Sequence, residues 1–195
     1  MKNFTLALVA LVFALPARAD DAGNWIENGD FTDGINHWYG GGRSPADYAN
    51  DNPLAANDPL TSKGLIMPLH SETWTKVAQD FKGKAASGVL SITYKLSPDF
   101  AFSTKPEDYQ NVPSKIGYDH WRAFNIPPGQ WMVYISDFGS DHGLYWMIPA
   151  KTGGEQTLHM KIQGLTPYAD KTITLAFPPG NGMFIVLNVT MADTP

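Results

Sequence analysis

The chain has 195 residues, with 14 Lys and Arg against 19 Asp and Glu, a formal net charge of −5 and no cysteine. Without cysteine it can hold no disulfide and no thiolate metal site. An acidic chain without a basic cluster is a poor binder of nucleic acid, because phosphate neutralisation supplies most of that affinity. Anionic membranes are disfavoured for the same reason.

Residues 1–19 have the pattern of a signal peptide. Lys2 supplies a positive start, residues 4–15 form an apolar run, and Ala17 and Ala19 flank Arg18 as in a cleavage site. The apolar run is shorter than the roughly 20 residues that a membrane-spanning helix needs. We therefore predict cleavage after Ala19, export to the periplasm or the extracellular space, no membrane insertion, and a single domain over residues 20–195.

Short apolar stretches separated by Gly and Pro follow, and several alternate with period two between apolar and polar residues. No stretch of a dozen residues has helical periodicity, and residues 40–63 are expected to form a long loop. One apolar and one polar face per strand is typical of antiparallel sheets that pack in two layers, so the sequence predicts an all-β, two-layer antiparallel β-sandwich. The expected strands are 25–31, 64–69, 74–81, 89–96, 121–126, 130–137, 144–149, 157–163, 171–177 and 183–191.

Three segments resemble a known family. Residues 24–34, which read N-W-I-E-N-G-D-F-T-D-G and are followed by Trp38, resemble the opening of the galactose-binding-like jelly rolls. Residues 74–81 resemble that family's W-x-x-V-x-Q-x-F strand, and residues 186–191 resemble its closing strand. The family includes the carbohydrate-binding modules of many cellulases and xylanases. The resemblance implies a jelly-roll sandwich and, less specifically, sugar binding, because one fold hosts many functions.

The same resemblance implies a structural calcium ion between the first and last strands. Calcium requires several oxygen ligands, and we expect Glu27, Asp30 and Asp193 to supply carboxylates, with Asp33 as a further candidate. Two positions depart from the family pattern, which often has Glu where Thr32 stands and Asp where Leu187 stands. The alternative is that Asp30 and its neighbour Asn28 only accept hydrogen bonds from turn amides.

Aromatic residues are the main candidates for binding a ligand, because a ring offers a flat apolar face on which a sugar can lie. Alternation places Trp74 on the opposite face from Val77 and Phe81, which point toward the core. The alternative is that each ring covers a sheet edge or packs under a loop. The predicted ligand-binding residues are Trp38, Tyr39, Trp74, Trp121 and Tyr134.

Catalytic groups are less evident. The middle third of the chain holds several carboxylates, but their spacing does not require a pair to meet in a cleft. Two Asp-His pairs, Asp119-His120 and Asp141-His142, would suit a divalent metal if their loops adjoined, although surface loops are the simpler interpretation. No nucleophile-elbow motif frames any serine. The carboxylates are Asp99, Glu107, Asp108, Asp119, Asp137 and Asp141.

From these observations we predict a secreted, non-catalytic, lectin-like domain that binds a glycan or polysaccharide and carries no cofactor beyond the calcium ion. Two alternatives remain open at this point. The first is an envelope or extracellular-matrix domain that binds a protein partner, which a contiguous exposed apolar patch would favour. The second is a small secreted polysaccharide-active enzyme, which needs clustered carboxylates or histidines in a cleft.

Overall fold

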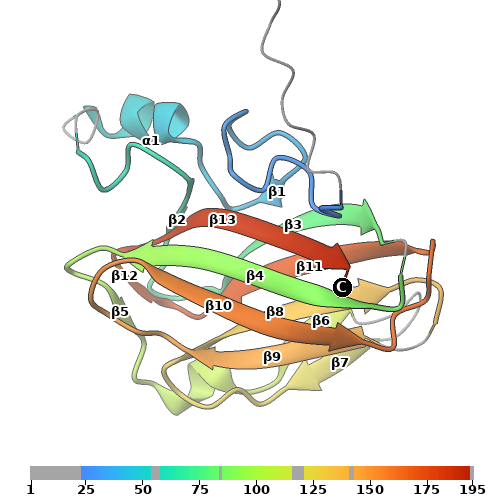
Figure 1. Cartoon of the computed structure of the whole chain (residues 1–195). Helices are drawn as coiled ribbons and strands as arrows, with labels where there is room; N and C mark the ends of the chain where they lie inside the picture. The colour runs from blue at the N-terminus through green and yellow to red at the C-terminus, as the bar shows by residue number, and fades with distance from the viewer. Residues whose placement is uncertain (1–22, 54–57, 84, 116–120, 141–142, 194–195) are drawn as a thin grey trace, which may run out of the picture.

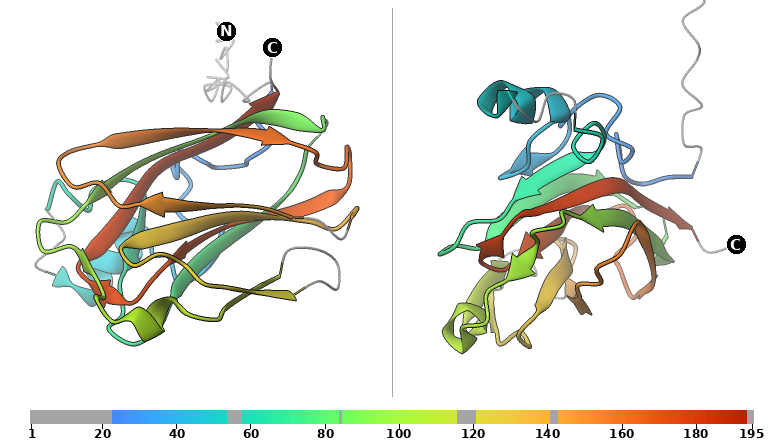
Figure 2. Two further views of the ribbon diagram at one scale, coloured as in Figure 1. Left: turned by 90° about the horizontal axis from the view of Figure 1, so that it is seen from below. Right: turned by 90° about the vertical axis from the view of Figure 1, so that its left-hand side faces the viewer.

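The computed structural model describes residues 23–53, 58–83, 85–115, 121–140 and 143–193. Two antiparallel sheets pack face to face around one main core (Figures 1 and 2). The predicted all-β, two-layer sandwich is confirmed. No helix within the described ranges has the length and apolar character needed to cross a membrane.

The first sheet has five strands in the order β1-β3-β11-β8-β9. Every neighbouring pair is antiparallel. The short edge strand β1 lies beside β3, whereas β9 forms the opposite edge. The bounds are β1 Tyr39–Gly40, β3 Thr75–Lys82, β11 Asp170–Phe177, β8 Gln130–Asp137 and β9 Gly143–Pro149.

The second sheet has four strands in the order β10-β4-β13-β2, again antiparallel throughout. The long last strand β13 lies between β4 and β2, and its register shifts between Val186 and Asn188. The bounds are β10 Gln156–Gln163, β4 Ser87–Leu96, β13 Met183–Asp193 and β2 Leu65–Pro68.

Smaller elements connect the two sheets. Helix α1, Pro45–Asp51, lies within the segment expected to be a loop. It is too short to show helical periodicity, but Ser44 caps it by accepting the backbone N–H of Asp47 at 3.1 Å. The other elements are β5 Ala101–Phe102, the 3₁₀-helix Pro106–Tyr109, β6 Val112–Lys115, β7 Trp121–Phe124 and β12 Gly180–Asn181.

Alternation sorts the side chains between the inner and outer faces as predicted. Trp131, Val133 and Ile135 of β8 are fully buried in the main core. Within that core, the ring of Phe177 stacks on Trp131 with 5.3 Å between centroids. Burial of large apolar side chains is the main stabilising term, at about 1.5–3 kcal/mol for each fully buried one.

A second, smaller cluster lies on the outer face of the five-stranded sheet. Tyr109, Val112, Phe124 and Ile126 cover Met132, Tyr134 and Ala176, which point outward from β8 and β11. The segment that carries β6 and β7 therefore folds back over one half of this face (Figure 2). The other half remains open.

The N-terminal segment is not the strand expected over residues 25–31. It makes one isolated bridge, between Asn24 and Ala192, and then continues as turns. Asn28 and Phe31 have positive φ angles of 46° and 57°, which an extended strand does not allow. The segment closes the side of the sandwich between β13 and β3, because the Trp25 amide donates to the Met191 carbonyl while the Gln79 side chain bonds the Glu27 backbone.

Candidate functional site

The open half of the outer face holds a hollow of about 330 Å³, called the sheet groove below. It lies across the strands, and its register is fixed by the ladder that pairs Tyr39 with Ala78, Ala78 with Thr174 and Thr174 with Tyr134. Because side chains alternate, these residues all project from the same face. The groove is lined by Tyr39, Gly40, Lys76, Val77, Ala78, Tyr134, Ser136, Phe138, Thr172 and Thr174.

Tyr39 is the most accessible ring of the groove, with 51% of its surface exposed. Its hydroxyl donates to Asp80 Oδ1 at 2.9 Å, and the Thr172 hydroxyl donates to the same oxygen at 2.6 Å. Partial burial, together with the adjacent Asp80 carboxylate, raises the pKa of Tyr39 to about 12. The phenol therefore stays protonated at ordinary pH, and its hydrogen bond fixes the ring on the sheet.

Two hydroxyl groups in the groove have no hydrogen-bond partner among the described residues. Tyr134 and Thr174 are neighbours on β8 and β11, and their residues are only 7% and 5% exposed. Neither hydroxyl is among the buried unpaired polar atoms of the described residues, which are the indole nitrogens of Trp25 and Trp131, so both hydroxyls are accessible from the groove. A polar molecule in the groove would satisfy both hydroxyls.

A larger hollow of about 940 Å³, called the end hollow, adjoins the groove and shares Tyr39, Phe138 and Thr172 with it. Four carboxylates line the end hollow, and one of them, Asp170, pairs with Lys82 at 3.0 Å. The remaining three are Glu27, Asp80 and Asp193. This end of the site is therefore acidic.

Lys171 also borders the end hollow but is held inside the fold. Its Nζ donates to the carbonyl oxygens of Thr166 and Ala169, at 2.5 and 2.9 Å. Burial lowers the pKa of Lys171, and the nearby Asp137 and Asp170 carboxylates oppose that shift. Asp137 itself accepts the backbone amides of Gly139 and Thr166. These contacts fix the loop before β11 and leave Lys171 few free donors for a ligand.

Of the aromatic residues predicted to bind ligand, the structure brings Tyr39 and Tyr134 together in the groove. Trp38 is only 5% exposed and packs in the main core, against Phe31. Trp74 points outward, as alternation predicted, but it packs edge-on against Tyr109 and donates its indole N–H to the Asp108 carbonyl at 2.7 Å. The side chain of Trp121 lies outside the described part of the structure.

The carboxylates predicted to hold calcium are engaged separately. Glu27 pairs with His37 at 2.8 Å, and Asp30 accepts the backbone amide and the hydroxyl of Thr32. Asp193 lines the end hollow. Across the described ranges, no three His, Cys, Asp or Glu side chains lie close enough together to hold a metal ion.

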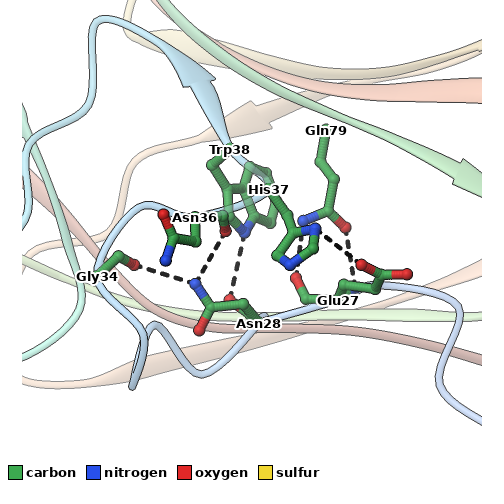
Figure 3. Close-up of polar contacts among 7 residues, drawn as sticks. All are labelled: Glu27, Asn28, Gly34, Asn36, His37, Trp38 and Gln79. Atoms are coloured by element: carbon green, nitrogen blue, oxygen red, sulfur yellow. Dashed lines mark hydrogen bonds and ion pairs between the residues drawn. The ribbon is translucent and has the colours of Figure 1, made fainter.

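Asn28 closes the loop where the resemblance implies a cation. Its side-chain Nδ2 donates to the carbonyls of Gly34 and Asn36, at 3.1 and 3.0 Å (Figure 3). Its Oδ1 accepts the amide of Asp33. Carbonyl oxygens are ligands that calcium prefers, yet here an amide group satisfies them. The residues present therefore do not fit a calcium ion in this loop.

Three of the described carboxylates considered for catalysis are held within the fold. Asp99 accepts a hydrogen bond from Ser97, Asp108 from Ser103, and Asp137 is buried. The Asp119-His120 and Asp141-His142 pairs lie outside the described residues. Alternation also places Lys76, Asp80, Thr172 and Thr174 on the outward side of β3 or β11, but they were not among the predicted ligand-binding residues. Alternation was the available signal, but only the pairing register places them beside Tyr134.

The fold class is the jelly-roll sandwich that the sequence resemblance implied. A family 61 carbohydrate-binding module (TmCBM61), solved with β-1,4-galactotriose, superposes with a TM-score of 0.51 at 12% identity, over 88% of this chain and 99% of the module. A family 16 carbohydrate-binding module also gives 0.51, at 13% identity, over 87% of this chain and the whole module.

A third similar structure is the enzymatically active domain of tailspike protein 4 from bacteriophage CBA120, with a TM-score of 0.51 at 10% identity. It is matched over 87% of this chain but over only 21% of its own length. No protein-family model and no curated protein sequence matches the chain. At these identities the similarity establishes the fold alone.

Proposed function

We propose that this chain is an exported, non-catalytic domain that binds a glycan in the sheet groove. The observation that carries the proposal is the combination, in one groove, of an accessible ring held by a hydrogen bond and two hydroxyls that have no partner among the described residues. The Tyr39 ring offers a stacking face, whereas Tyr134 and Thr174 offer hydrogen bonds to sugar hydroxyls. A shallow site of this kind is expected to bind in the millimolar to micromolar range, about −4 to −8 kcal/mol.

The distribution of exposed apolar side chains favours a glycan over a protein partner. Among the described residues, the large hydrophobic side chains that are exposed are three tyrosines, Tyr39, Tyr145 and Tyr168. Each carries a hydroxyl, and only Tyr39 lines the sheet groove. A protein-docking surface usually presents a larger contiguous apolar patch.

The test is a binding screen of the chain without residues 1–19 against neutral oligosaccharides, including β-1,4-galactotriose and oligomers of β-1,4-glucan and xylan. Isothermal titration calorimetry should detect at least one ligand, and Tyr39→Ala should abolish its binding. The matched control is Tyr168→Ala, which removes an even more exposed tyrosine, 73% accessible, outside the groove. Equal losses in the two variants, or new reducing ends released from the ligand, would contradict the proposal.

A further inference from the structure

Tyr39, Asp80 and Thr172, called the acceptor cluster below, share one hydrogen-bonding atom at the junction of the sheet groove and the end hollow. The hydroxyls of Tyr39 and Thr172 both donate to Asp80 Oδ1, at 2.9 and 2.6 Å. Each hydroxyl has only one hydrogen to donate. Both hydrogens are therefore committed to Asp80.

The acceptor cluster can therefore accept further hydrogen bonds but cannot donate any. Asp80 Oδ2 has no partner among the described residues, and Asp80 is exposed where it lines the end hollow. The two hydroxyl oxygens still have lone pairs that can accept, but their hydrogens are already used in hydrogen bonds. A ligand that reaches this junction must supply the hydrogens, as a sugar hydroxyl or an ammonium group does. A carboxylate or a sulfate supplies none.

The surrounding charges act in the same direction. Four carboxylates, those of Glu27, Asp80, Asp170 and Asp193, line this hollow against two lysines, Lys82 and Lys171, so its net charge is negative. An anionic group placed here would meet like charges, which is a common way for a site to reject a wrong ligand.

We infer that the acceptor cluster makes Asp80 the specificity-determining residue of the site, which selects hydroxyl-bearing neutral glycans and rejects uronic or sulfated ones. The inference rests on the proposed function. It goes beyond that function because it names the class of glycan and the residue that decides it.

The experiment compares two probes: the tightest-binding neutral oligosaccharide of the screen, and the same oligosaccharide oxidised at C6 to the uronate. The wild-type chain should prefer the neutral form by about fivefold or more, the expected effect of one like charge at about 4 Å even in water. Asp80→Asn keeps an oxygen for Tyr39 and Thr172 but turns an N–H donor toward the ligand. The preference should then fall to within about twofold.

Asp193→Asn is the matched control, because it removes the same charge from the same hollow without touching the acceptor cluster. Its preference for the neutral probe should fall clearly less than that of Asp80→Asn, because the lost charge lies in the same hollow but outside the acceptor cluster. A second readout needs no variant: raising salt from about 10 mM to about 1 M shortens the screening length from about 30 Å to about 3 Å and should reduce the wild-type preference.

The outcomes separate the two proposals. Equal wild-type binding of both probes, or an unchanged preference in Asp80→Asn, overturns the role of Asp80 and leaves glycan binding in place. An equal loss of preference in Asp193→Asn also overturns it, because general acidity then suffices. If neither probe binds the wild-type chain, the proposed function and this inference fail together.

Discussion

The indole nitrogen of Trp38 donates a hydrogen bond to the backbone carbonyl of Asn28 at 3.3 Å. This bond links the two ends of the N-terminal loop, and the Trp38 ring lies in the main core, 5.4 Å from the Phe31 ring. Trp38 and Tyr39 are adjacent in sequence, yet the first stabilises the fold while the second faces the groove. The sequence pattern could not separate them, because both precede the same glycine-rich segment.

We expect Trp38→Ala to reduce the free energy of unfolding by about 3–5 kcal/mol, since it leaves a cavity in a packed core. Tyr39→Ala should cost within about 1 kcal/mol, as exposed positions usually do. Chemical denaturation of both variants measures the difference. Similar losses for the two neighbours would contradict the assignment of Trp38 to the core and Tyr39 to the groove.

Asn28→Asp should destabilise the chain by about 1–3 kcal/mol. The substitution preserves shape and keeps an acceptor for the Asp33 amide, but it removes the two N–H donors that satisfy the carbonyls of Gly34 and Asn36. Chemical denaturation of the variant and the wild type measures the loss.

Removal of calcium from the wild-type chain should leave its melting temperature unchanged. Thermal unfolding with and without a chelator measures this. A bound calcium ion at a hundredfold excess over its dissociation constant would instead add about 2.7 kcal/mol, a shift of several degrees.

Sequence alternation predicted the sandwich because its signal is local. Strands β4 and β10 bury one side of a period-two pattern, which needs no knowledge of the partner strand. Strands β8 and β11 carry the same sequence pattern, although the structure buries both of their sides. The N-terminal segment departs from prediction because Asn28 and Phe31 adopt positive φ angles, which the apolar residues around them do not signal. The resemblance at residues 24–34 identified the fold correctly, whereas the strand expected from the pattern of residues 25–31 was wrong.

The candidate site was only partly predictable for a different reason. Alternation tells which side of a sheet a residue faces, but not what covers that side. Trp74 and Tyr134 both face outward, and the segment carrying β6 and β7 then buries most of both under Tyr109 and Phe124. That covering depends on contacts between distant parts of the chain, so no local sequence pattern predicts it.

Trp74→Ala should destabilise the chain by about 2 kcal/mol and leave glycan affinity unchanged. The ring contributes an edge contact to Tyr109 and a hydrogen bond to the Asp108 carbonyl, and it does not line the sheet groove. Phe81→Ala is the control in the main core and should cost about 3–5 kcal/mol. Loss of binding in Trp74→Ala at nearly unchanged stability would restore Trp74 as a ligand residue.

Tyr39 should titrate near pH 12 rather than near its ordinary value of 10.0. A raised pKa means that the stabilising phenol bond to Asp80 is fully present below about pH 10 and is lost as the pH rises toward 12. The tyrosinate absorbance of the wild type minus that of Tyr39→Phe isolates this group. A difference curve centred near pH 10 would show that the phenol is not held by Asp80.

Gly40 fixes the position of Tyr39, so Gly40→Ala should weaken both the edge strand and ligand binding. Its φ is +119°, and an added Cβ would lie 2.3 Å from the backbone carbonyl oxygen of Lys76 on β3. Because that oxygen belongs to a paired strand, β1 must move, and Tyr39 moves with it.

Gly153→Ala is the matched control. The φ of Gly153 is +99°, but an added Cβ would meet nothing within 4 Å, so only backbone strain of about 1–3 kcal/mol remains. Melting temperature and glycan affinity should both fall in Gly40→Ala, whereas Gly153→Ala should lower only the melting temperature. If the affinities of the two variants match, the ring of Tyr39 does not depend on β1, and the groove must bind its ligand through β8 and β11 instead.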